Sequence, residues 1–258
     1  MNADQDCKSP STIDIARRSP DFYKWAKIPL NTTSKSSNGR AGFLFKPPFS
    51  ATKYFFFLQS HPEHSTSLQI DAVRANKFAQ LEGNNSIFWQ HYEVDLGFPL
   101  KRDLEDSPGN STDGNFGAIA LPDEQTGKSR LYIFKLDQAE IHYCYIPLRE
   151  DGSIDSYHAT FKASGKQAIQ VGNVFPFQGP CLLQTQKSSE SKGRIIVLWS
   201  QGEGDFPLKG YSGFIEPDGM APNAEEWTEI EFPFSQNQGW DNGHYTGWSA
   251  LIVPSTYE

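Results

Sequence analysis

Short apolar runs separated by turn residues dominate the hydrophobic pattern of this chain. Runs of Phe, Tyr, Ile, Val and Trp are interrupted by Gly, Pro, Asn and Ser, and helical periodicity is nearly absent. This pattern is typical of an all-β domain. The best helical candidate, residues 67–83, fits either one amphipathic helix or a strand followed by a turn. We therefore predict strands along most of the chain.

A repeated opening divides the chain into units. Four segments begin with a glycine followed by an apolar stretch: "GFLFKPPF" at Gly42, "GAIALPDE" at Gly117, "GPCLLQTQ" at Gly179 and "GWSALIVP" at Gly247. After three of the four openings, the same succession of further strand-like segments follows. Self-similarity of this kind is the signature of a repeat architecture.

Each complete unit contains four predicted strands. The second strands are "KYFFFLQ", "RLYIFKL" and "RIIVLWS", which are continuously apolar after a basic residue and should be buried on both faces. The third strands are "LQIDAVR", "IHYCYIPL" and "GYSGFIEP", and the more polar fourth strands are "WQHYEVDL", "SYHATFK" and "EWTEIEFPF". Asp151-Gly152 and Asp218-Gly219, between third and fourth strands, predict tight turns.

Units of four antiparallel strands predict a β-propeller-like fold. Residues 12–30 resemble the third and fourth strands of a unit, and the segment from Gly247 resembles a first strand. We predict that both chain ends complete one blade of a single domain, residues 12–258, behind a disordered tail, residues 1–11. No second strand is recognisable for that blade. The alternative is therefore that the chain forms part of a larger ring, which a homo-oligomer completes. A β-sandwich or jelly roll is the alternative fold.

Composition excludes several classes of partner. The formal net charge is −8, so the chain lacks the basic surface that nucleic acids and anionic membranes require. No signal peptide and no apolar run long enough to span a membrane is visible, which favours a cytoplasmic location over secretion. Cys144 and Cys181 lie in apolar runs and are predicted to be buried free thiols.

Candidate ligand residues lie in the loops that follow the second and fourth strands, which share one end of a propeller. Aromatic rings beside carboxylates suit a glycan or small polyol, because sugar C–H faces pack on rings while hydroxyls form paired hydrogen bonds. The segment 238–248 is the richest of these loops. The predicted ligand residues are Trp240, Asp241, His244, Tyr245, Glu203, Asp205, Asp137 and Glu140.

Catalytic and cofactor motifs are not recognisable. The chain has no nucleophile elbow, no phosphate-binding loop and no dinucleotide fingerprint, so we predict no catalytic residue and no cofactor. The segment "HPEH", residues 61–64, offers two histidines and Glu63, but no third partner at useful spacing, so no metal site is predicted. A glycoside hydrolase that uses loop carboxylates and a protein-interaction scaffold are the alternative functions.

In "GAIALPDEQTGKSRLYIF", a glycine-led strand is followed by a polar turn and by an apolar strand after a basic residue. This succession resembles the blades of lectin-type propellers from fungi and bacteria, loosely over residues 42–258. The resemblance implies a carbohydrate-binding module rather than an enzyme. In fucose-binding members of that group, an Arg, a Glu and an aromatic residue from neighbouring blades hold each sugar. No such triad recurs from unit to unit here, so the resemblance implies no particular sugar.

Overall fold

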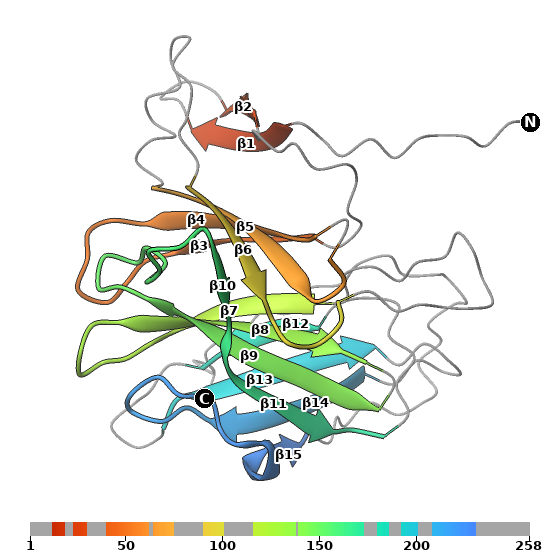
Figure 1. The fold of residues 1–258 in the computed structure, drawn as a ribbon. Helices are drawn as coiled ribbons and strands as arrows, with labels where there is room; N and C mark the ends of the chain where they lie inside the picture. Colours follow the sequence, from red (N-terminus) through yellow and green to blue (C-terminus); the bar gives the residue numbers. More distant parts are fainter. Residues whose placement is uncertain are drawn as a thin grey trace, which may run out of the picture.

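Antiparallel strands build the fold of this chain (Figure 1), which is described by a computed structural model. The residues that the structure describes are 12–18, 23–29, 40–61, 64–74, 90–100, 116–137, 139–172, 180–185, 192–200 and 208–230. Among these residues, helical structure is confined to one 3-10 turn, η2 (Ala224–Glu226). The all-β prediction is therefore confirmed.

A hairpin stands at the N-terminal end. Strands β1 (Thr12–Arg18) and β2 (Tyr23–Pro29) pair antiparallel, with Thr12 opposite Pro29 and Arg18 opposite Tyr23. Both strands lie within residues 12–30, where the sequence predicts two neighbouring strands. The first strand predicted to complete their sheet begins at Gly247, which lies outside the described residues.

Three sheets follow, and each contains four strands paired antiparallel as hydrogen-bonded neighbours. The first sheet also has a fifth strand, which pairs in parallel. The prediction of several antiparallel sheets is therefore confirmed. The first sheet contains β3 (Arg40–Phe45), β4 (Tyr54–Ser60), β5 (Ser67–Arg74) and β6 (Gln90–Asp95). The second contains β7 (Phe116–Pro122), β8 (Ser129–Leu136), β9 (Glu140–Leu148) and β11 (Ser164–Gln170). The third contains β12 (Cys181–Gln184), β13 (Arg194–Ser200), β14 (Leu208–Phe214) and β15 (Thr228–Glu229).

One predicted strand belongs to another sheet. The segment "SYHATFK" was expected to be the fourth strand of the second unit, but its strand, β10 (Thr160–Lys162), pairs in parallel with β6 of the first sheet. The fourth strand of the second sheet is β11, which pairs antiparallel with β9. The prediction for this segment was wrong because both segments are polar and short, and only long-range pairing distinguishes them.

The second strand of the middle sheet is buried on both faces, as its continuous apolar run predicts. Leu131 and Ile133 pack in the core between the first and second sheets. Tyr132 and Phe134 pack in the core between the second and third sheets. Successive side chains of a strand point to opposite faces, so β8 joins the two cores. None of the four is more than 1% exposed.

The two Asp-Gly turns have the predicted tight geometry. Gly152 and Gly219 have φ angles of +88° and +78°, in the left-handed region that glycine adopts without strain. In each turn the glycine N–H donates to the carbonyl three residues earlier, at 2.9 Å and 2.8 Å. Asp151 and Asp218 each accept the N–H two residues later, at 2.9 Å and 3.1 Å, which stabilises the turn.

Neighbouring sheets contact each other in a repeated way. The Asp-Gly turn of the second sheet lies against the β3–β4 turn, since a Cβ placed on Gly152 would be 2.6 Å from Pro47. The Asp-Gly turn of the third sheet lies against the β7–β8 turn, since a Cβ on Gly219 would be 2.7 Å from the Pro122 carbonyl oxygen. Each sheet is therefore positioned on the one before it by equivalent turns.

The first strands of successive sheets also lie near one another. Strand β7 contacts both β3 and β12, and a Cβ on Gly117 would lie 2.5 Å from the Pro180 carbonyl oxygen. The three sheets are stacked in chain order (Figure 1), and none of the described sheets closes into a barrel. Propeller blades and sandwiches both stack sheets in this manner.

Candidate functional site

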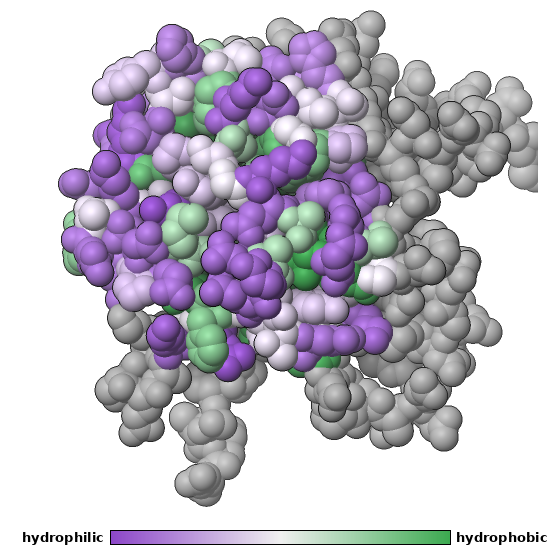
Figure 2. All heavy atoms as spheres, turned by 60° about the horizontal axis from the view of Figure 1, so that its bottom comes forward, coloured by the Kyte–Doolittle hydropathy of each residue, from purple (hydrophilic) through white to green (hydrophobic). Residues whose placement is uncertain are grey.

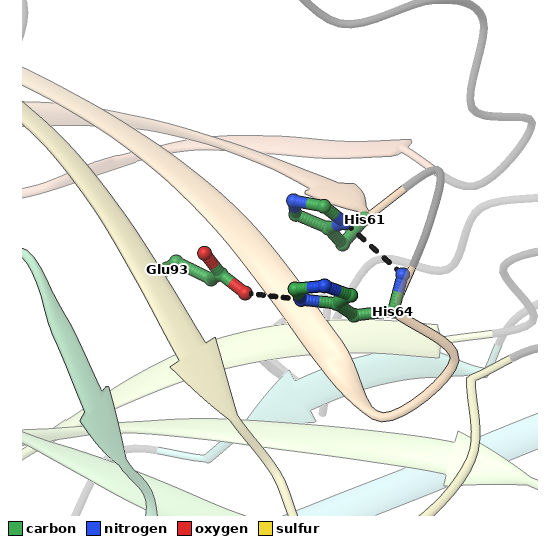
Figure 3. A group of neighbouring side chains, drawn as sticks. All are labelled: His61, His64 and Glu93. Carbon is green, nitrogen blue, oxygen red and sulfur yellow. Dashed lines mark hydrogen bonds and ion pairs between the residues drawn. The ribbon is translucent and has the colours of Figure 1, made fainter.

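Two polar clusters lie at the end of the first and second sheets where the second strand turns into the third. The first, called the His–Glu cluster, consists of His61, His64 and Glu93 (Figure 3). The turn between β4 and β5 carries both histidines. It is closed by two backbone hydrogen bonds, from His61 to Ser67 at 2.9 Å and from Ser67 to His64 at 3.1 Å. Glu93 comes from β6, on the far side of β5.

The three side chains of the His–Glu cluster converge. His64 Nδ1 lies 2.8 Å from Glu93 Oε1. The His64 backbone N–H donates to His61 Nδ1 at 3.1 Å, and the two imidazole rings stack with centroids 4.4 Å apart and planes 15° apart. One possible ligand atom from each residue lies within 4.8 Å of the others.

Charge in the His–Glu cluster favours an ionised carboxylate. The hydrogen bond with His64 lowers the pKa of Glu93; partial burial opposes this shift, and the charges of His61 and His64 add to it. The His64 side chain is 58% exposed and that of Glu93 is 28% exposed, so solvent reaches the cluster. The arrangement therefore presents two imidazoles and one anionic carboxylate to solvent.

The sequence did not indicate Glu93 as a partner of the histidines. The residue stands 29 positions after His64, on the fourth strand of the unit. The acidic residue within "HPEH", Glu63, lies outside the described residues. The predicted strand order did indicate that the fourth strand, which carries Glu93, lies beside the third. Its register was not predictable, and so the contact was missed.

The second cluster, called the His142 cluster, contains two of the predicted ligand residues. Asp137 and Glu140 bracket the turn between β8 and β9, where the Asp137 N–H donates to the Glu140 carbonyl at 2.8 Å. Glu140 Oε2 lies 3.1 Å from His142 Nε2, and Gln170 of β11 donates to the other carboxylate oxygen of Glu140. The negative charges of both predicted carboxylates therefore lie near the His142 imidazole, where they act to raise its pKa.

Burial dominates the properties of His142. Its pKa is lowered by burial; the negative charges of Glu140 and Asp137 oppose this shift, and nearby lysine charges reinforce it. The ring stacks on Phe98 with centroids 5.4 Å apart. Its Nδ1 atom is buried and has no hydrogen-bond partner among the described residues. A neutral imidazole with an unsatisfied nitrogen thus lies behind the surface carboxylates.

The segment after β6 connects the two clusters. Leu100 donates its N–H to the Ser65 carbonyl at 2.7 Å, within the turn that carries the histidines. Two lysines of the second sheet, Lys135 and Lys166, donate to the carbonyls of Pro99 and Gly97. The polar ends of the first two sheets are therefore held together by direct hydrogen bonds.

Six of the eight predicted ligand residues lie outside the described residues. They are Glu203, Asp205, Trp240, Asp241, His244 and Tyr245. Their assignment to a ligand site stays a prediction, while Asp137 and Glu140 lie together at the expected end of the second sheet.

The opposite end of the sheets carries exposed aromatic side chains. Phe49 is 72% exposed and Tyr157 is 93% exposed, with the Arg149 guanidinium 5.1 Å from the Tyr157 ring centroid. A depression of about 60 Å³ is lined in part by Pro122 and Glu216, well below the ~300 Å³ of a typical small-molecule pocket. The predicted aromatic ligand residues, Trp240 and Tyr245, belong to a loop expected at the other end of the sheets.

The surface that Figure 2 presents is mainly hydrophilic. Hydrophobic groups on its described part form small patches separated by polar side chains. Scattered apolar groups of this kind are normal for protein surfaces, whereas protein-binding faces carry larger continuous patches. This face gives no particular support to the protein-interaction scaffold.

A buried carboxylate lies within the first sheet. Asp71 of β5 interacts with His91 of β6, its neighbour across the strand pair, and its side chain is 5% exposed. Burial raises the pKa of Asp71, and the contact with His91 opposes this shift. The Oδ2 atom of Asp71 has no hydrogen-bond partner among the described residues.

The described cysteines are both free. Cys144 is buried, as predicted, and burial raises its pKa to about 12. Cys181 is half-buried rather than buried, because β12 is the first strand of the third sheet and its side chains pack less completely. The raised pKa of Cys144 is the opposite of what a catalytic thiol nucleophile needs.

Comparison with known proteins adds no relative. No protein-family model matches the chain, and no curated protein matches it significantly. Among the described residues, no helix is long and apolar enough to cross a membrane.

Proposed function

We propose that this chain is a carbohydrate-binding module of the lectin type, built on a propeller-like scaffold. Support for the scaffold comes from the first strands, since β7 contacts both β3 and β12. Further support comes from the equivalent Asp-Gly turns that contact the preceding sheet. In a propeller the first strands of the blades line the central axis, and each blade packs on its neighbours in this repeated way.

The His142 cluster carries the proposal for the ligand end. Asp137 and Glu140 are carboxylates at a turn, and Glu140 is oriented by Gln170 and His142. Carboxylates held by neighbouring hydrogen bonds are suited to accept paired hydrogen bonds from adjacent sugar hydroxyls. A glycan or small polyol is the ligand class that this chemistry fits.

A direct binding measurement tests the proposal. The chain is screened on a glycan array, and the best ligand is titrated by calorimetry against wild type, Glu140→Gln and Glu150→Gln. Glu150 is an exposed carboxylate in the Asp-Gly turn of the second sheet and serves as the matched control. We expect Glu140→Gln to weaken binding about tenfold or more, as for other charged hydrogen bonds to a ligand, and Glu150→Gln to leave it unchanged. Absence of any glycan ligand, or equal weakening by both variants, would contradict the proposal.

The glycoside hydrolase alternative has weaker support among the described residues. Such an enzyme needs one carboxyl group with a raised pKa facing the scissile bond. Asp71 has a raised pKa, but it is buried between strands and held by His91. The array hits are therefore also assayed for turnover as chromogenic glycosides, and hydrolysis abolished by Asp137→Asn or Glu140→Gln would favour the enzyme over the lectin.

The assembly state forms a separate part of the proposal. Among the described residues, the N-terminal hairpin contributes two strands, β1 and β2, to its sheet. We propose that a second copy of the chain provides further strands to complete the ring. We expect light scattering after size-exclusion chromatography to give a mass above the 29.0 kDa of one chain. A mass of one chain would indicate that the ring closes within the chain or that the sheets form a sandwich.

A further inference from the structure

We propose that the His–Glu cluster binds a divalent transition-metal ion, with zinc as the expected ion. The ligands are one imidazole nitrogen each of His61 and His64 and a carboxylate oxygen of Glu93. This inference goes beyond glycan binding and does not depend on it.

The geometry requires the ligand side chains to move inward and rotate. The three donor atoms lie within 4.8 Å of one another. Zinc binds imidazole nitrogen and carboxylate oxygen at about 2.0–2.2 Å, so the donors must move inward around the ion. Glu93 is held in β6, whereas the histidines stand at the two ends of the β4–β5 turn, so metal binding requires rotation of the imidazole side chains.

The donor set determines the class of ion. Two imidazoles and one carboxylate suit zinc and its neighbours in the first transition row, while calcium and magnesium prefer sites made of oxygen atoms. Three protein ligands leave a fourth position for water or a bound molecule, as in catalytic zinc sites. The partly exposed side chains of His64 and Glu93 leave this position accessible to solvent.

Metal binding changes which ring nitrogen carries the proton of each imidazole. His64 Nδ1 faces the Glu93 carboxylate, and therefore carries a proton there whenever Glu93 is ionised. The His64 N–H bond to His61 Nδ1 leaves the proton of neutral His61 on Nε2. Metal binding at His61 Nε2 moves that proton to Nδ1 and releases the backbone N–H to solvent. Each ligating nitrogen must be unprotonated, so acid weakens metal binding.

Contacts within the cluster place both imidazoles near the carboxylate. An exposed pair between His64 and Glu93 contributes little to stability. The His64 backbone N–H bond and the ring stacking at 4.4 Å hold His61 against His64. Parallel stacked rings cannot both direct a nitrogen lone pair at one ion, so metal binding rotates the imidazoles out of this stack. A metal ion uses both rings in their neutral form.

The experiment uses the whole chain and the metal alone. After treatment with chelator, the protein is titrated with Co²⁺ while visible absorption is recorded, and Zn²⁺ affinity is then measured by competition. The variants are His64→Gln and Glu93→Gln, and the matched control is His158→Gln, because His158 is exposed on the loop before β10. We expect a Co²⁺ spectrum of four-coordinate type in the wild type and the control.

Each ligand variant should weaken Zn²⁺ binding by at least about tenfold, since loss of even an outer partner has that effect. Equal affinity in wild type, His64→Gln and Glu93→Gln would overturn the proposal, as would a loss that is equally large in His158→Gln. If Glu93→Gln does not fold, as judged by circular dichroism, His61→Asn on the exposed turn gives the same test. Glycan titrations with and without chelator are run in parallel, so that a failure of sugar binding is distinguished from a failure of metal binding.

Discussion

Arg130 at the start of β8 binds Asp218 in the Asp-Gly turn of the third sheet. Its guanidinium donates to the Asp218 carbonyl and lies 3.7 Å from the carboxylate. An equivalent contact joins Arg74 of the first sheet to Asp151 of the second, at 3.3 Å. The residues that form tight turns within one sheet therefore also bind the preceding sheet.

Substitution of the turn glycine should weaken this contact between sheets. Gly219→Ala places a Cβ 2.7 Å from the Pro122 carbonyl oxygen at a φ of +78°, so backbone strain and a steric clash act together. We expect a loss of about 2–4 kcal/mol in the free energy of unfolding, measured by urea denaturation. Gly172→Ala is the matched control, because its φ is +75° and its Cβ would meet nothing within 4 Å. Its loss should be limited to the strain, about 1–2 kcal/mol; equal losses in both variants would argue against the packing of the turn on Pro122.

Truncation of the shared strand β8 should affect stability strongly. Leu131→Ala removes a side chain that is 0% exposed from the core between the first and second sheets, leaving a cavity. We expect a loss of about 2–5 kcal/mol in denaturant unfolding. Leu44→Ala is the control, since Leu44 is 55% exposed; its effect should lie within about 0.5 kcal/mol. A Leu131→Ala loss as small as that of Leu44→Ala would show that β8 is not central to the core.

The half-buried imidazole of His142 should contribute to acid sensitivity. Its folded pKa lies below the ordinary value of 6.5, so the unfolded chain binds more protons between the folded pKa and 6.5. This contribution to stability is present above pH 6.5 and is lost as the pH falls toward the folded pKa. Urea denaturation at several pH values should therefore show a smaller loss of stability on acidification in His142→Gln than in wild type. His158→Gln, at an exposed position, should retain the wild-type slope, and a wild-type slope in His142→Gln would refute the assignment.

The buried thiol of Cys144 should resist modification in the native state. Burial excludes reagents, and a pKa raised to about 12 keeps the group protonated at neutral pH. We expect the native wild type and Cys144→Ala to react with a thiol reagent at the same rate and to the same extent. In denaturant the wild type should expose three thiols and the variant one fewer. Slower native labelling of Cys144→Ala would show that the thiol is accessible.

Local features of the sequence were sufficient for the all-β class and for the Asp-Gly turns. The apolar run within β8 predicted burial on both faces, because consecutive apolar residues place apolar side chains on both sides of a strand. Asp151-Gly152 and Asp218-Gly219 predicted their turns, because few other residues adopt a positive φ without strain. These properties depend on neighbours in the chain, which the sequence displays directly.

Pairing between distant segments was decided only by the tertiary structure. Residues 156–162 and 164–170 are both polar, and it is the parallel pairing of β10 with β6 that assigns the first of them to another sheet. Glu93 joins His61 and His64 for the same reason, since the register of β6 beside β5 determines which carboxylate reaches the turn. Register depends on how whole sheets bury their faces against one another, and no short stretch of sequence contains that information.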